Sequence, residues 1–359
     1  MITLASGARR FPAPLQGGET VDILQFGVRL PVLLLPVLAF LALLVYFDSF
    51  RLVRYRLILL LLVAGVVSAG ASMHVNRAVF DALSIEFLTF SRFVAPWIEE
   101  GLKAGVLAWL IRSKRVGLPV DAAIAGFALG SGFALFENLF YLLSRPDLSP
   151  TSLVIRGFST AVMHGGATAV FGMVSVVLAD RRPHHFWMVM LPGLAAAAVL
   201  HGAYNLLLVR PALSMLLVLV ALLVTFYFVF RYSEDSLRDW LESGLDSNVE
   251  MLALINGGQL MQSRIGEHLR ALAGRFDGES LADMICLLRL QVELALRAKG
   301  LLIMKELGVE PELDDDIRSR LQELRALEAS LGRTGQLAIR PLLMATGKDL
   351  WQLKLLERA

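Results

Sequence analysis

The feature that most constrains this chain is a series of long apolar stretches in its first 232 residues. A transmembrane helix needs about 20 mostly apolar residues. Stretches that meet this condition occupy residues 27–47, 56–73, 92–111, 121–143, 152–179, 187–209 and 212–230. We therefore expect an all-α, polytopic membrane helical bundle with about seven transmembrane helices, embedded in a lipid bilayer.

The distribution of acidic residues divides the chain. Of its 32 acidic residues, 21 follow Tyr232. We expect an N-terminal segment over 1–26, a transmembrane domain over 27–231 and a soluble helical domain over 232–359. The first segment lacks the apolar core and cleavage site of a signal peptide, so we interpret it as a non-cleaved start. The net charge of +2 indicates no class of partner, and we expect no nucleic-acid partner.

Two features describe the soluble part more closely. Apolar stripes at helical spacing predict one helix that ends at Gly308 and another that ends at Gly332. The single cysteine, Cys286, excludes an internal disulfide and a cysteine-rich metal site.

Basic residues alternate between the connecting loops and predict the orientation. The first, third and fifth loops are the more basic ones, and basic loops stay cytoplasmic. Their residues are Arg51, Arg54, Arg56, Arg112, Lys114, Arg115, Arg181 and Arg182. We therefore expect a multi-pass membrane protein with its C-terminal domain in the cytoplasm.

The apolar segments contain a few ionisable residues, each of which costs about 2.5–3.5 kcal/mol at the bilayer centre. In the third segment Glu99 and Lys103 are four residues apart and can pair on one helix face, which leaves Glu100 without a partner on its own helix. In the fourth segment Glu137 is followed by Asn138, an expected interhelical hydrogen-bonding residue, and by Tyr141, which is spaced to hydrogen-bond the carboxylate.

The fifth and sixth segments each carry a histidine with a polar residue one turn later. These pairs are His164 with Thr168 and His201 with Asn205. A lone histidine on an apolar helix is usually a packing residue, but the repeated pattern favours a shared site. We expect the polar faces of four helices to converge, and this inventory suits hydrolysis by an activated water. Alternatively, His164, His201 and Glu137 bind zinc with one position open for water.

The order of these motifs resembles the PrsW family of intramembrane proteases, relatives of the CAAX-prenyl endopeptidases and bacteriocin-processing membrane proteases. The resemblance covers residues 90–210. The motifs are Glu99-Glu100-x-x-Lys103, then Phe133-x-x-x-Glu137-Asn138-x-x-Tyr141, then His164 with Thr168, then His201-x-x-x-Asn205.

The resemblance implies an intramembrane endopeptidase of a bacterial inner membrane that hydrolyses a membrane protein substrate, such as a single-pass anti-sigma factor in signalling. Glu99 or Glu100 would then activate the water, and Asn205 would stabilise the oxyanion. Glu137, His164 and His201 would complete the centre, with Lys103, Asn138, Tyr141 and Thr168 in support. Relatives are described both as metal-dependent and as glutamate proteases, so zinc stays open as a cofactor.

Two other functions also fit buried ionisable residues. A proton- or cation-coupled transporter uses such chains as relays, although no internal inverted repeat is evident here. A non-catalytic membrane scaffold that presents the soluble domain is the third hypothesis.

Overall fold

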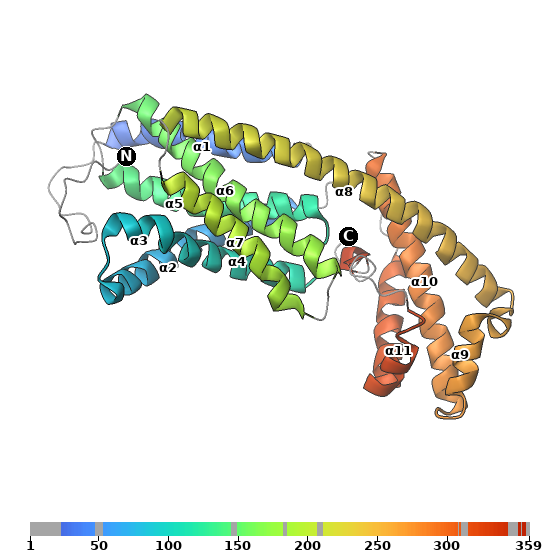
Figure 1. The fold of residues 1–359 in the computed structure, drawn as a ribbon. Helices are drawn as coiled ribbons and strands as arrows, with labels where there is room; N and C mark the ends of the chain where they lie inside the picture. The colour runs from blue at the N-terminus through green and yellow to red at the C-terminus, as the bar shows by residue number, and fades with distance from the viewer. Residues whose placement is uncertain are drawn as a thin grey trace. The chain divides into compact units, whose positions relative to one another are not determined.

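The structure is a computed structural model (Figure 1). It describes residues 23–46, 53–144, 149–181, 185–206, 211–307, 309, 315–343, 351–352 and 354–356. Over these ranges the regular secondary structure is entirely helical, which confirms the predicted all-α class. The chain divides into two units, Met1–Arg231 and Tyr232–Ala359, and each is described by itself. Most of the N-terminal segment predicted over 1–26 lies outside the described residues.

The membrane unit is built from long apolar helices. They are α1 (Ile23–Tyr46), α2 (Tyr55–Leu83), α5 (Pro119–Ser144), α6 (Pro150–Arg181), α7 (Phe186–Asn205) and the first part of α8 (Pro211–Asn256). Within the described residues, these 6 helices are long and apolar enough to cross a membrane. The polytopic helical bundle that we predicted is therefore confirmed as an architecture.

The predicted span 92–111 is divided into two helices. The short α3 (Phe87–Phe93) ends at Val94, and α4 (Ala95–Arg112) begins directly after it. Pro96 lies in the first turn of α4, where its missing N–H is not needed for a helical hydrogen bond. Helix α4 is not among the helices apolar enough to cross a membrane, because it carries four charged residues. These residues are Glu99, Glu100, Lys103 and Arg112.

Two helices continue beyond the spans expected from hydropathy. α2 extends to Leu83, although its apolar stretch was expected to end at residue 73, and α8 continues through residue 231 to Asn256. A helix does not need to end where its composition becomes polar, because its backbone hydrogen bonds are internal. The extra turns of α2 matter for the site, since they carry Asn76.

The central helix of the membrane unit is α5, which packs against α2 and α6. Two glycines allow this close approach. A Cβ atom on Gly130 would lie 2.3 Å from the carbonyl oxygen of His164 on α6, and one on Gly132 would lie 2.1 Å from that of Leu62 on α2. The absence of a side chain at these two positions therefore lets α5 lie against α2 and against the helix that carries His164.

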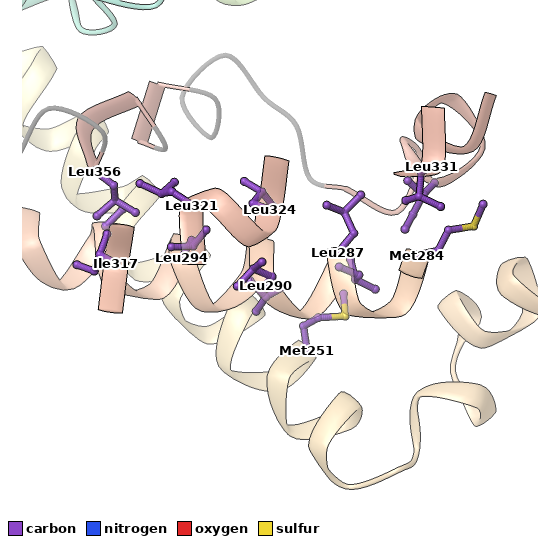
Figure 2. Close-up of a cluster of buried hydrophobic side chains, with 14 of the residues drawn as sticks. Met251, Met284, Leu287, Leu290, Leu294, Ile317, Leu321, Leu324, Leu331 and Leu356 are labelled. Carbon is purple, nitrogen blue, oxygen red and sulfur yellow. The ribbon is translucent and has the colours of Figure 1, made fainter. Parts of the chain in front are cut away.

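The C-terminal unit has a conventional apolar core (Figure 2). Its helices after α8 are η2 (Leu260–Gln262), α9 (Arg264–Leu272), α10 (Gly278–Glu306) and α11 (Asp315–Ile339). Met251 of α8, Leu287 and Leu294 of α10, and Leu321 and Leu324 of α11 belong to one buried cluster.

Local sequence signals define the ends of these helices. The side chains of Ser263 and Asp277 accept the backbone N–H groups of Gly266 and Ser280 and cap α9 and α10. Gly332, where we expected a helix end, has a φ of 58° and interrupts α11, which then resumes and continues to Ile339.

Candidate functional site

Several ionisable and polar residues of the membrane unit form one contiguous cluster. Helix α4 supplies Glu99, Glu100 and Lys103, and α5 supplies Glu137; His164 and Thr168 come from α6, His201 from α7 and Asn76 from α2. Each residue contacts at least one other member of the cluster. The sequence indicated convergence of four helices, and the structure adds α2 as a fifth.

The centre of the cluster is a buried ion pair between Glu100 and Lys103. Lys103 Nζ lies 2.6 Å from Glu100 Oε1, and both side chains are almost fully buried. This corrects the expected pairing of Lys103 with Glu99, since spacings of three and four residues both bring helical side chains together. Because an unpaired charge in a membrane interior is costly, this contact neutralises the two most deeply buried charges.

Glu100 is also hydrogen-bonded from the other helices. Thr168 Oγ1 donates to its Oε2 at 3.2 Å, and His201 Nδ1 donates to its Oε1 at 2.9 Å. Glu100 therefore joins α4 to α6 and α7. Side chains of three residues thus occupy both of its oxygens, which suits a carboxylate that orients its neighbours.

These contacts define the proton positions of the two imidazoles. His201 donates from Nδ1, so its Nε2 carries a lone pair, and that atom lies 3.7 Å from Glu99 Oε2. The Nδ1 of His164 lies 3.0 Å from Lys103 Nζ. An ammonium group can only donate, so His164 Nδ1 is the acceptor and its Nε2 carries the proton. That Nε2–H donates to Glu137 Oε2 at 2.9 Å.

Glu99 is less tightly held than Glu100. Asn76 Nδ2 donates to its Oε1 at 2.9 Å, and its Oε2 faces His201. The Glu99 side chain is 17% exposed, whereas that of Glu100 is 1% exposed. Asn76 was not among the predicted residues, although Ser68, Ser72 and Asn76 recur every four residues on α2 and could have indicated a polar stripe.

Glu137 lies at the more open edge of the cluster. Its side chain is 40% exposed, and Arg156 Nη2 on α6 lies 3.6 Å from its Oε1. We expected Tyr141 to hydrogen-bond Glu137, but its ring instead lies 3.6 Å from the Arg156 guanidinium carbon. Arg156 was also missed, because its partners lie on a different helix and intrahelical spacing does not show them.

The two asparagines predicted near the site contact backbone groups. Asn138 Nδ2 donates to the carbonyl of Gly157 at 2.9 Å, which is the interhelical role that we expected. Asn205 Nδ2 donates to the carbonyl of Ser91 at 2.9 Å and links the end of α7 to α3. One N–H of the Asn205 amide is therefore engaged in a structural contact between these helices.

Three residues of the cluster suit a metal ion. One ligand atom each from Glu99, His164 and His201 lies within 4.8 Å of the other two. Two imidazoles and one carboxylate form a common catalytic zinc set, which leaves a position for water. Glu99 thus takes the place that we predicted for Glu137, because the carboxylate whose oxygen lies close to ligand atoms of both histidines is that of Glu99.

The donor set fits zinc in its chemistry. His201 presents a lone pair at Nε2 while its Nδ1 is held by a carboxylate, as metal-binding histidines usually are. His164 would have to release the Nε2 proton that it now donates to Glu137, and metal binding commonly releases protons in this way.

The fold and the cluster define a polytopic helical membrane protein with a buried carboxylate–imidazole site. The sequence model of the PrsW family, described as a PrsW family intramembrane metalloprotease, matches residues 54–232. The chain belongs to this family through its membrane unit, and it is in general class an intramembrane protease. Comparisons with curated proteins and with solved structures found no significant match.

Proposed function

We propose that this protein is an endopeptidase that hydrolyses a peptide bond of a membrane protein at the cluster around Glu99, His164 and His201. The observation that carries the proposal is their convergence from three helices, with ligand atoms within 4.8 Å of one another. Residues that are costly to bury in a membrane usually mark a site. The substrate that we favour is a single-pass membrane protein of the anti-sigma-factor kind.

The contacts support different roles for the two adjacent glutamates. Glu99 has one oxygen facing His201 and is partly exposed, so it is the better candidate to accept a proton from water. The hydroxide so formed attacks the peptide carbonyl carbon, and the C–N bond then breaks. Glu100 positions His201 and Lys103, because its oxygens are already occupied by them and by Thr168.

The departing amine needs a proton. Glu137 is the most exposed carboxylate of the cluster and shares a hydrogen bond with His164, so this pair is suited to deliver it. One N–H of the Asn205 amide supports the link between α3 and α7, so its predicted role towards the oxyanion falls to the second N–H of the same amide.

If the protein uses a metal, Glu99, His164 and His201 would hold zinc. Zinc supplies Lewis-acid polarisation of the carbonyl and a more acidic water. Glu137 would then be the remaining carboxylate beside His164 that can accept the proton of water. Zinc analysis of the purified protein distinguishes a metal-dependent from a metal-independent mechanism. Stoichiometric zinc in the parent that is lost in His201→Asn supports the metal-dependent mechanism.

Cleavage is tested by comparing protein termini in cells that carry the parent chain or a variant. The test variants are Glu99→Gln, Glu100→Gln, Glu137→Gln, His164→Asn and His201→Asn, and the control is His74→Asn, an exposed histidine on α2. Loss of a general base lowers rates by about 10²–10⁴-fold. The proposal is supported if new termini form only in cells with an active chain. They should be present with the parent and with His74→Asn, and absent with Glu99→Gln. Parent-like cleavage by the Glu99 and His201 variants would overturn it and favour a transporter or a scaffold.

The location of the site supports cleavage near the extracytoplasmic face. Glu99 lies one turn from the start of α4, and His201 one turn from the end of α7. Both ends lie on the side opposite the basic loop that contains Lys114 and Arg115. The exposed Cys286 is a natural reporter of the other side. An impermeant maleimide should label it only after cells are permeabilised, and labelling in intact cells would reverse the orientation.

A further inference from the structure

Asn76 differs from the other polar residues of α2. Its side chain is buried, with 6% exposed, in a helix that otherwise suits lipid. Ser72 and Ser68, one and two turns earlier on the same face, donate to carbonyls of their own helix. Asn76 instead reaches to α4 and donates to Glu99 Oε1 at 2.9 Å. The hydroxyls of the two serines are hydrogen-bonded within α2, whereas the amide of Asn76 is hydrogen-bonded to a residue of the site.

The contact with Glu99 defines which end of the amide is used. An ionised carboxylate only accepts hydrogen bonds, so the Nδ2 end of Asn76 must face it. The Oδ1 end is buried and has no hydrogen-bond partner among the described residues. A buried acceptor without a partner costs about 1–3 kcal/mol. This cost is explained if a hydrogen-bond donor is supplied when the site is filled.

We propose that Asn76 is a positioning residue of the hydrolytic site, which holds Glu99 with Oε2 towards His201 while its own Oδ1 accepts a hydrogen bond from bound water or a substrate N–H. This inference rests on the proposed function and adds a fifth helix to the catalytic arrangement. Without Asn76, the carboxylate of Glu99 loses the one hydrogen bond to its Oε1 that the described residues provide.

The decisive variant is Asn76→Leu, which keeps the approximate volume and removes both polar ends. It removes the unpartnered acceptor as well as the hydrogen bond to Glu99, and these two changes oppose each other, so the thermal midpoint in detergent should change little. Misplacement of a reacting group by about 1 Å can lower rates by about 10²-fold. The substrate for this assay is the protein whose new termini depend on the parent chain. We expect kcat of Asn76→Leu for this substrate to fall about 10- to 100-fold, with KM little changed. Asn76→Gln, which keeps an amide, should retain more activity.

The matched control is Ser72→Ala, on the same face of α2 and equally buried. Its hydroxyl bonds the carbonyl of Ala69, so its removal should leave kcat close to the parent value. A parallel fall in thermal midpoint and kcat in both Asn76 variants would assign Asn76 a merely structural role and overturn the proposal. Parental kcat in Asn76→Leu would overturn it as well.

A second readout does not need cleavage. Glu99 can be labelled in the purified full chain with a hydrophobic carbodiimide and quantified by mass spectrometry. Asn76→Leu removes the hydrogen bond that holds Glu99, so Glu99 in this variant should react several-fold faster. The rate of labelling should not change in Ser72→Ala. Unchanged labelling would overturn the positioning role even if the protein proves to be a protease. Faster labelling in a protein that cleaves no substrate would support the role of Asn76 in holding Glu99 and would reject only the proposed function.

Discussion

The membrane unit and the C-terminal unit place their charged side chains in opposite environments. Glu100 and Lys103 are almost fully buried, whereas the helices α1, α2 and α8 expose large apolar residues such as Leu60 and Val67. In the C-terminal unit a large apolar cluster is buried and most charges are outside it, and Lys299, which lies over the ring of Trp240, is a buried exception. There Asp316 accepts from Arg297 and Arg320, and all three are roughly one-third exposed.

The difference shows what charge pairs do in each unit. On the surface of the C-terminal unit, water solvates each charge, so an ion pair contributes little to stability. In the membrane unit a single charge has no such compensation, and its partners must come from neighbouring helices. The same residue types are therefore optional in one unit and interdependent in the other. The following substitutions test this contrast.

The largest effect is expected when one buried charge loses its partner. Lys103→Met should lower the free energy of unfolding by about 3–5 kcal/mol, because Glu100 stays buried without a cation. The measurement is unfolding of the detergent-solubilised protein. The double variant Glu100→Gln with Lys103→Met should recover part of the loss, since neither charge remains. Unfolding of the single variant at parent stability would show that His201 and Thr168 suffice to stabilise Glu100.

The next effect compares the same substitution in both units. Leu294→Ala empties a fully buried position of the C-terminal core and should cost about 2–5 kcal/mol. Leu60→Ala on α2 changes a side chain that is 65% exposed, and should cost only about 0.5 kcal/mol in the membrane. Hydrogen exchange of α10 and α2 measures the two losses. Equal losses would mean that exposure in this structure does not describe contact with lipid.

A smaller effect is expected from helix packing beside the site. Gly130→Ala places a methyl group against the backbone of His164 and should cost about 1–3 kcal/mol through overpacking. Gly70→Ala on α2 meets nothing within 4 Å and should be neutral or stabilising by about 0.4–1 kcal/mol. Thermal midpoints in detergent compare the two. A neutral Gly130→Ala would indicate that α5 and α6 can separate without loss.

The smallest effect is expected in the surface network of the C-terminal unit. The side-chain hydrogen bonds from Arg320 and Arg297 lower the pKa of Asp316 below its ordinary value of 3.8. A lowered folded-state pKa means that the stabilisation is complete above that ordinary value and is lost as pH falls through the folded-state pKa. Asp316→Asn should therefore change stability little at pH 7. In the parent, the protection of α11 from hydrogen exchange should fall as Asp316 becomes protonated at low pH, and in this variant that part of the fall should be absent. A large loss at neutral pH would contradict the expected solvent screening.

Sequence reasoning found the costly residues more easily than their partners. Glu99, Glu100, Glu137, His164 and His201 stand out because each is ionisable within an apolar stretch. Asn76 and Arg156 do not stand out, because one lies beyond the apolar part of α2 and the partners of the other lie on α5. Spacing within one helix also allowed two pairings for Lys103, and it favoured Glu99 incorrectly.

The amino-acid sequence by itself determined that the chain enters a membrane, that it is helical, and which polar groups need an interior partner. These properties follow from composition along a single helix, because the hydropathy of a segment, and the need of a charge within it for a partner, do not depend on which partner it finds. Tertiary structure alone decided that Lys103 binds Glu100, that Asn76 holds Glu99, and that Asn205 bonds the backbone. Hydrogen bonds extend only about 3 Å, so the helix packing set by residues such as Gly130 selects each partner.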